Sequence, residues 1–148
     1  MATCGDVMTR EPVYCVPADS VAHAAELMRT HDVGSLPVVE SVDSRTLVGI
    51  VTDRDLVVKV VAGTRAVDDA TVRDAMTPDP FRCRADDDLE RAVSVMGERR
   101  VRRMPVVDAD GRLVGIIAQA DIATRVQQDA RTGELVEAIS EPGTGNNA

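Results

Sequence analysis

The chain is nearly devoid of aromatic side chains. Its 148 residues include one tyrosine (Tyr14), one phenylalanine (Phe81) and no tryptophan. Proteins that bind single-stranded nucleic acid stack the bases on aromatic side chains, and a formal net charge of −8 opposes binding to a phosphate backbone. We therefore expect no nucleic-acid partner.

Apolar runs long enough to cross a membrane are absent as well. No stretch approaches the roughly 18 consecutive apolar residues of a membrane-spanning helix. The N-terminal segment MATCGDVMTREP lacks the apolar centre of a secretory signal, so we expect a cytoplasmic protein without a membrane partner. The three cysteines include no C-x-x-C pair, and we expect Cys15 and Cys83 to be buried thiols in a reducing compartment.

The residue patterns of common catalytic sites are missing too. The sequence contains no G-x-S-x-G motif, no Walker phosphate loop and no G-x-G-x-x-G motif. Its two histidines, His23 and His31, fall on one predicted helix, where we interpret them as structural or solvated residues. No cluster of histidine, cysteine or carboxylate side chains has the spacing of metal ligands. The sequence therefore predicts neither an enzyme nor a metal site.

What the sequence does contain is an internal repeat. The segment DVMTREPVYCVPADS, from Asp6, returns as DAMTPDPFRCRADDD, from Asp74, and LVGIVTDRDL returns as LVGIIAQADI. Between Thr3 and Val39 the offset is 68, and thirteen of thirty-seven positions are identical, where average composition gives about two or three. After Val39 the offset is 66. Two copies that cannot each close a core are expected to pack about a pseudo-twofold axis, with a ligand cleft between them.

Each copy is predicted to fold as β-α-β-β-α, which places the protein in the α/β (α+β) class. The pattern of the first copy predicts a strand Val13–Val16, a helix capped by Asp19, a hairpin of strands Ser35–Glu40 and Thr46–Thr52, and a helix from Asp53 that stops at Gly63. The first helix carries an apolar stripe of Val21, Ala24, Ala25 and Met28. In the second copy, the equivalent helices start at Asp87 and near Gln119, and short helices, Cys4–Met8 and Val72–Met76, lead into the two copies.

The repeat also predicts the domain organisation. We expect the first motif over residues 1–62, a linker over 63–70 and the second motif over 71–131. The remaining tail, 132–148, is small and polar at its end, and we expect disorder from about residue 140.

The leading candidate for a site is the junction where a strand runs directly into a helix. In GIVTDRD, Thr52 ends the strand and Asp55 lies in the first helical turn. Free N–H groups at a helix start favour phosphate, and a carboxylate can accept both hydroxyls of a ribose. Alternatively, Thr52 and Asp55 form a helix cap and bind nothing. The second copy keeps the carboxylate as Asp121 but has Ala118 in place of the hydroxyl, so the two pockets are not expected to be equivalent.

A run of arginines stands out in this acidic chain. Residues 99–103 read RRVRR, between a helix and a strand of the second copy, whereas the first copy has HDVGS at the same place. Guanidinium groups suit phosphate oxygens. The run is therefore either a phosphate clamp that faces one pocket or a solvated helix end.

The repeat, the P-V-V strands and the G-h-h-[TS]-x-x-D junction together resemble a pair of cystathionine-β-synthase (CBS) domains, the Bateman module. The resemblance covers roughly Cys4 to Arg125 and is closest to small stand-alone CBS-pair proteins of bacteria, some of which resemble hypoxia- or stress-response proteins. It implies that an adenosine-containing ligand binds between the two domains as a regulatory ligand, with no tightly bound cofactor. AMP, ADP, ATP, NAD-type molecules and S-adenosylmethionine belong to that class. It also implies a homodimer formed through the CBS motifs.

The resemblance assigns contacts to individual residues. Asp55 would hold the ribose, and Thr52 would contact the ribose or a phosphate. The rest of that pocket would be lined by Val16, Ala18, Val33, Gly34 and Ser35, with Arg102 and Arg103 of the opposite copy on the phosphates. A weaker second pocket would use Asp121, Ala118 and Val101, and Ala118 departs from the family pattern.

Two hypotheses follow. The first is a stand-alone regulatory module that binds an adenosine-containing ligand and signals to an unknown effector protein by a change of conformation. The alternative is a structural or protein-interaction dimer with degenerate pockets and no nucleotide ligand, which the loss of threonine at Ala118 favours. Catalysis ranks behind both, because no nucleophile or base is visible.

Overall fold

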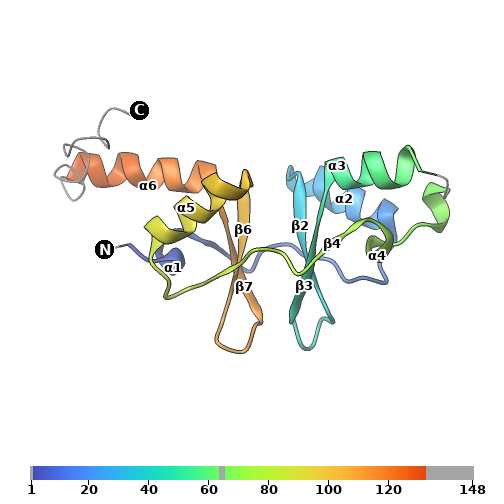
Figure 1. Cartoon of the computed structure of the whole chain (residues 1–148), viewed down its shortest axis with the longest axis horizontal. Coiled ribbons are helices and arrows are strands. Elements are labelled where there is room, and N and C mark those ends of the chain that lie inside the picture. The colour runs from blue at the N-terminus through green and yellow to red at the C-terminus, as the bar shows by residue number, and fades with distance from the viewer. Residues whose placement is uncertain (1, 64–65, 133–148) are drawn as a thin grey trace.

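Figure 1 shows the protein as a computed structural model, which describes residues 2–63 and 66–132. Its elements are α1 Cys4–Val7, β1 Thr9–Arg10, α2 Val21–His31, β2 Ser35–Val39, β3 Leu47–Thr52, α3 Asp53–Asp55, the π-helix η1 Leu56–Val61, the 3-10 helix η2 Val67–Asp69, α4 Val72–Ala75, β4 Thr77–Pro78, β5 Cys83–Arg84, α5 Leu89–Arg99, β6 Arg103–Val107, β7 Leu113–Ala118 and α6 Gln119–Thr132. The tail expected after Thr132 lies outside the described residues.

Two sheets form the centre of the molecule, and each is completed by a strand that belongs to the other copy. One sheet has the order β1-β7-β6-β5 and the other β2-β3-β4. β1 leads into the first copy but pairs with β7 of the second, where Thr9 lies opposite Ile116. β4 leads into the second copy but pairs with β3 of the first, where Thr77 lies opposite Ile50. The two copies therefore exchange their N-terminal segments.

The hydrophobic cores show the same exchange. Cys4, from α1, is fully buried in the core of the second copy, together with Met96 and Ile117. Val72, from α4, is fully buried in the core of the first copy, beside Leu36. Full burial of one aliphatic side chain of this kind contributes about 1.5–3 kcal/mol. Each core therefore depends on a helix that the other copy supplies.

The two sheets face each other, and the helices of the two halves lie at opposite ends of the molecule (Figure 1). The hairpins of the two halves meet in a buried cluster, the seam, which consists of Val39, Leu47, Val107 and Leu113. Backbone hydrogen bonds join the hairpins there, from the Leu47 N–H to the Gly111 carbonyl at 3.1 Å and from the Leu113 N–H to the Arg45 carbonyl at 2.9 Å. The seam fixes one end of the sheets against each other.

Most of the predicted helices and strands are observed, but the prediction of a strand at Val13–Val16 is wrong. Only one bridge forms there among the described residues, between Cys15 and Val38. Pro12 and Pro17 flank the segment, and a proline has no N–H to donate to a ladder. The segment therefore runs as an extended crossover from one sheet to the other.

The predicted helix caps are one residue too early in both copies. The Oγ of Ser20, rather than Asp19, accepts a hydrogen bond from the third residue of α2 at 3.0 Å. Asp88, rather than Asp87, caps α5. The carboxylates of Asp19 and Asp87 instead accept backbone N–H bonds that close the preceding turns. Ala25 also departs from expectation, since it is exposed while the other three residues of its stripe are buried.

The helix predicted to start at Asp53 is confirmed, but it changes from an α-helix to a π-helix after its first turn. After α3, the chain continues as the π-helix η1, and a Cβ on Gly63 would lie 2.5 Å from the Lys59 carbonyl oxygen. A glycine is therefore required where this helix ends.

The three thiols are free and buried, as expected for Cys15 and Cys83. Burial is the largest cause that raises the pKa of Cys15, to about 12, and it also raises the pKa of Cys83. Thiolates, rather than thiols, are the reactive species. These side chains therefore behave as small core residues.

A thiol-labelling experiment tests this packing. At pH 8, a thiol with a pKa of about 12 is ionised in roughly one molecule in 10⁴. We expect a disulfide reagent such as DTNB to modify the native protein no faster than the protein unfolds, and to modify all three cysteines at once in guanidinium chloride. Stoichiometric labelling of the native protein within minutes would contradict the burial of the thiols.

Two glycine substitutions test the strand exchange. A Cβ on Gly115 would lie 2.5 Å from the Met8 Sδ and 3.0 Å from the Thr9 carbonyl oxygen, so Gly115→Ala must displace β1. We expect it to lower the free energy of unfolding by about 1–3 kcal/mol in urea titrations. Gly97, in α5, has no neighbouring atom within 4 Å of such a Cβ, and Gly97→Ala is expected to raise stability by about 0.5–1 kcal/mol. Equal changes in the free energy of unfolding for Gly115→Ala and Gly97→Ala would contradict the exchange of N-terminal segments.

Candidate functional site

A cleft lies between the two sheets, away from the seam. Cross-strand partners share one face of a sheet, so Ser35 and Pro37 share a face with their partners on β3. This face looks across the cleft at Arg103 and Ile116 of the other sheet. The resulting cavity of about 510 Å³ is lined by residues of both halves: Thr9, Glu11, Pro12, Val13, His31, Val33, Ser35, Pro37, Arg103 and Ile116.

The cavity combines apolar walls with a small number of polar groups. Thr9, Glu11, His31, Ser35 and Arg103 contribute two hydroxyls, a carboxylate, an imidazole and a guanidinium. The Ser35 Oγ is buried and lacks a hydrogen-bond partner within the described part of the chain. Leaving such a group unpaired costs about 1–3 kcal/mol, so this position favours a molecule that supplies a partner. A cavity of this size and composition is typical of small-molecule sites.

Several lining residues were not anticipated from the sequence. Thr9, Glu11 and Val13 reach the cleft because β1 pairs with β7, and nothing in the repeat pattern indicates that exchange. His31, which the sequence suggested to be structural or solvated, lies on the cavity wall at the end of α2. The proximity of Glu11, His31 and Arg103 gives this part of the cleft charged groups of both signs.

The strand order decides which strand-to-helix junction continues this cavity. On β7, Ile116 lines the cavity and Ala118 lies two residues further on the same face, opposite Arg103 on β6. Asp121 follows in the first turn of α6. We call this side of the cleft, bounded by the crossover 11–14 and the end of α2, the α2-side edge.

The other junction lies toward the opposite side of the cleft. Thr52 ends β3, and β3 pairs with β4, which leads into the second crossover, 79–82. We call the side bounded by this crossover and the end of α5 the α5-side edge. Thr52 pairs with Ser35 on one side, and Asp55 is joined through Lys59 to the Ala75 carbonyl of α4 on the other. This junction therefore borders the α5-side edge and is not part of the wall of the cavity of about 510 Å³, which Val33 and Ser35 line.

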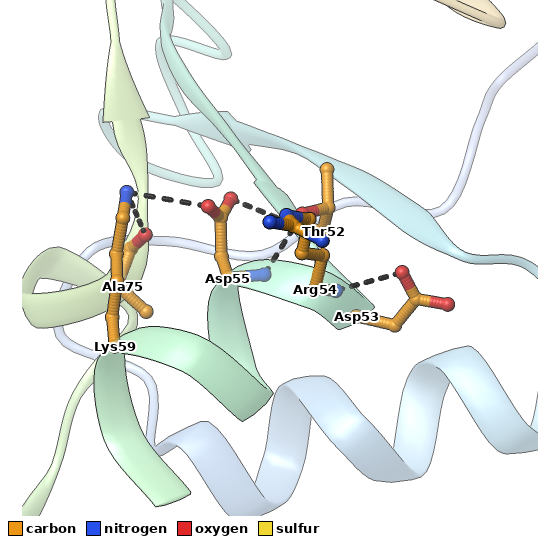
Figure 2. Close-up of polar contacts among 6 residues, drawn as sticks. All are labelled: Thr52, Asp53, Arg54, Asp55, Lys59 and Ala75. Carbon is orange, nitrogen blue, oxygen red and sulfur yellow. Dashed lines mark hydrogen bonds and ion pairs between the residues drawn. The ribbon is translucent and has the colours of Figure 1, made fainter. Parts of the chain in front are cut away.

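Figure 2 shows that Thr52 and Asp55 are engaged with each other. The Thr52 N–H donates to Asp55 Oδ2 at 3.0 Å, and the Asp55 N–H donates to Thr52 Oγ1 at 3.0 Å, which makes a capping box. Lys59 Nζ lies 3.2 Å from Asp55 Oδ1 and donates to the Ala75 carbonyl at 3.1 Å. Asp55 therefore already stabilises the helix start and joins it to α4.

The second junction keeps half of this arrangement. The Ala118 N–H donates to Asp121 Oδ2 at 3.2 Å, but Ala118 has no hydroxyl to return the bond. Arg103 is part-buried and lines the cavity, whereas Arg102 is exposed and its carbonyl accepts the Gln119 N–H at 3.0 Å. Of the two arginines expected on phosphates, the structure brings Arg103 into the cleft.

The remaining expected residues lie outside the cavity wall. Val16 packs against the seam, and Ala18 is exposed in the turn before α2. The Gly34 carbonyl accepts the Asp53 N–H at 2.9 Å, so Gly34 braces the start of α3. Val101 packs against the core of the second copy.

The two crossovers share an unusual backbone conformation. Glu11 and Asp79, at equivalent positions of the repeat, both have φ of 49°, a left-handed conformation that is uncommon for residues with a side chain. The second crossover is held further by Arg82, whose guanidinium lies 2.7 Å from Asp79 Oδ1 and reaches the Leu47 carbonyl at 3.5 Å. Both edges of the cleft are therefore built from defined, repeated turns.

Two global features complete this description. Within residues 2–63 and 66–132, no group of three or more histidine, cysteine or carboxylate side chains could hold a metal ion. In the same described residues, no helix has both the length and the apolar character needed to cross a membrane.

Comparisons with known proteins agree with this architecture. Hypoxic response protein 1 of Mycobacterium tuberculosis is 34% identical over 142 residues, which cover 96% of this chain and 96% of that protein. The crystal structure of CBSX2 in complex with AMP has a TM-score of 0.79 at 34% identity, over 88% of this chain and 100% of that chain. The CBS domain pair of protein MJ0100, in complex with 5′-methylthioadenosine and S-adenosyl-L-methionine, has a TM-score of 0.75 at 25% identity, over 87% and 98%.

The family itself is settled by a direct match. The CBS domain model matches residues 4–62 and 72–128, one range for each copy of the repeat. The family resemblance read from the sequence is confirmed, and the chain belongs to the CBS domain family as a CBS domain pair.

Proposed function

We propose that this CBS pair is a regulatory module that binds an adenosine-containing ligand in the cleft between its halves. The observation that carries the proposal is the cavity of about 510 Å³, which takes its walls from both halves and contains the unpartnered Ser35 Oγ. The complexes of CBSX2 with AMP and of MJ0100 with 5′-methylthioadenosine and S-adenosyl-L-methionine support the ligand class. AMP, ADP, ATP, NAD-type molecules and S-adenosylmethionine all belong to it.

The proposed contacts divide between the two edges. At the α2-side edge, Val33, Gly34 and Ser35 surround the base or sugar, and Asp121 is the candidate for the ribose hydroxyls. Arg103 is the candidate for a phosphate. At the α5-side edge, Thr52 and Asp55 are the ribose or phosphate contacts, with Val101 and Arg102 nearby; we assign Val16 and Ala18 supporting roles at the strand end. The carboxylates must exchange their present partners, most of all the Lys59 ion pair of Asp55.

A ligand in this position would affect the arrangement of both halves of the molecule. The seam holds one end of the two sheets, so a ligand that contacts both halves at the other end favours one angle between them. It shifts the population only if it binds that arrangement more tightly than the alternatives. An effector protein then recognises the changed angle between the halves. The module itself performs no catalysis. We place it in the cytoplasm.

Thermal unfolding with AMP, ADP, ATP, NAD and S-adenosylmethionine tests the proposal. A ligand at 100 times its dissociation constant adds about 2.7 kcal/mol, a rise in Tm of roughly 5–11 °C for a chain of this size. Asp121→Asn and Asp55→Asn form a matched pair, because the side-chain oxygen of asparagine still accepts the backbone N–H of Ala118 or Thr52 but the amide offers one acceptor fewer to a ribose. We expect both variants to fold and at least one to bind at least tenfold more weakly.

A second function has specific support and is separated by the same experiment. Ala118 lacks the hydroxyl, and the Asp55 carboxylate is occupied by Thr52 and Lys59, as expected of degenerate pockets in a protein-interaction dimer. If none of the five compounds raises the Tm at millimolar concentration, the ligand-binding function is rejected in favour of this one.

We also propose that the protein forms a homodimer through the helices of its CBS motifs. Val57, Val58 and Val61 of η1 are 57%, 50% and 66% exposed, and together they make an apolar strip on one helix. Burial of such a strip against a second copy gains about 25 cal/mol per Å² of apolar surface.

The dimer is tested by light scattering after size exclusion. We expect twice the protomer mass of 15.8 kDa for the natural protein and a single protomer for Val57→Glu/Val61→Glu. Val42→Glu is the control, because Val42 is 64% exposed but lies in a hairpin turn of the other end. A dimer that survives the double substitution would place the interface elsewhere.

A further inference from the structure

The two edges of the cleft are built by equivalent segments but differ in two side chains. At the α2-side edge, the cavity is lined by Val13 of the crossover and His31 at the end of α2. At the offset of 68, the equivalent residues of the α5-side edge are Phe81 and Arg99. The repeat thus provides an internal comparison of two edges that have equivalent positions in the repeat but different side chains.

Phe81 and Arg99 stack on each other. The guanidinium carbon of Arg99 lies 4.2 Å from the centroid of the Phe81 ring. Phe81 is 48% exposed, and the two side chains also line a smaller cavity of about 290 Å³ beside α5. A guanidinium held over a ring by its carbon retains N–H donors at its edge, and it loses less rotamer freedom when it binds an anion.

The cavity beside the stack is lined by three arginines, Arg82, Arg91 and Arg99, and by two carboxylates, Asp87 and Glu98. The positive charge that favours an anion lies mainly in the arginine run at the end of α5. Arg99, Arg100, Arg102 and Arg103 crowd the corner between α5 and β6, where the first copy has a histidine, an aspartate, a glycine and a serine. In a chain of net charge −8, the run concentrates positive charge where α5 meets β6, with Arg99 beside the smaller cavity and Arg103 in the wall of the larger one. The complete Thr52 and Asp55 junction borders the α5-side edge.

We infer that Phe81 is a positioning residue that holds Arg99 as an anion receptor, and that this pair makes the α5-side edge selective for the phosphates of a nucleotide. The inference rests on the proposed binding of adenosine-containing ligands and adds the property that discriminates among them. The α2-side edge has Val13 and His31 in place of this pair and keeps Arg103 as the one guanidinium that lines its cavity among the described residues, so it binds with less dependence on phosphate.

A purely structural role for the stack makes a different prediction. Arg99 ends α5, where a cation is favoured by the helix dipole, and its stem covers part of an exposed ring. If that were the whole role, removal of the ring would alter stability but leave the preference for phosphorylated ligands as it was.

The test is calorimetric titration of the full chain with adenosine, AMP, ADP and ATP, at low and at physiological salt. The variants are Phe81→Val and Arg99→His, which install the residues of the first copy, and Phe81→Tyr, which keeps an aromatic ring. Arg100→His removes one charge from the same corner without touching the stack. We expect Phe81→Val and Arg99→His to weaken ADP and ATP by about three- to tenfold, while adenosine changes less than about twofold.

The remaining outcomes are equally decisive. Phe81→Tyr is expected to retain the natural preference, and Arg100→His to change it by less than about twofold. Equal weakening of adenosine and ATP in Phe81→Val, or no weakening of either, overturns the positioning role while leaving the proposed function intact. If the natural protein binds none of the four compounds, the proposed function fails first, and the inference fails with it.

Discussion

The exchange of N-terminal segments between the two copies is the contact on which the rest of the structure depends. α1 and β1 complete the core and sheet of the second copy, and α4 and β4 do the same for the first. Because neither core nor sheet is complete without a segment of the other copy, the two halves are expected to unfold together. The residues that edge the cleft are set in place by this exchange, because each crossover starts in one sheet and ends beside the other.

The cleft exists because the sheets are held together at one end and kept apart at the other. The seam closes the hairpin end with aliphatic contacts and backbone hydrogen bonds. At the other end, the facing positions Ser35 and Arg103 are polar and cannot form an equally dry contact. The Ser35 hydroxyl at this end is buried without a partner in the described part of the chain, and this unpaired group supports the proposed binding of a ligand there.

The sequence predicted the fold well because hydrophobic periodicity, turn residues and the repeat all agreed. The prediction failed where strand pairing depended on distant segments. The segment Val13–Val16, which lies between two prolines, forms one bridge instead of the predicted strand. The pairing of β1 with β7 could not be predicted, because no feature of the neighbouring sequence indicates it. For the site, the sequence indicated Val33, Ser35 and Arg103, which line the cavity, and missed His31 at the end of α2 and Thr9, Glu11 and Val13, which the exchange brings to the cleft. It gave no sign that Asp55 follows a strand paired with β4 whereas Asp121 follows a strand paired with β1.

The pairing of Thr9 with Ile116 has a consequence for how the chain acquires its structure. The two residues are separated by 107 positions (116 − 9), so β1 is synthesised long before its partner β7. Closing so long a loop is entropically costly, and contacts of this kind slow folding. During translation, the N-terminal segment must wait with its apolar residues uncovered until β7 has left the ribosome, and an interrupted chain exposes both an unpaired strand and half a core.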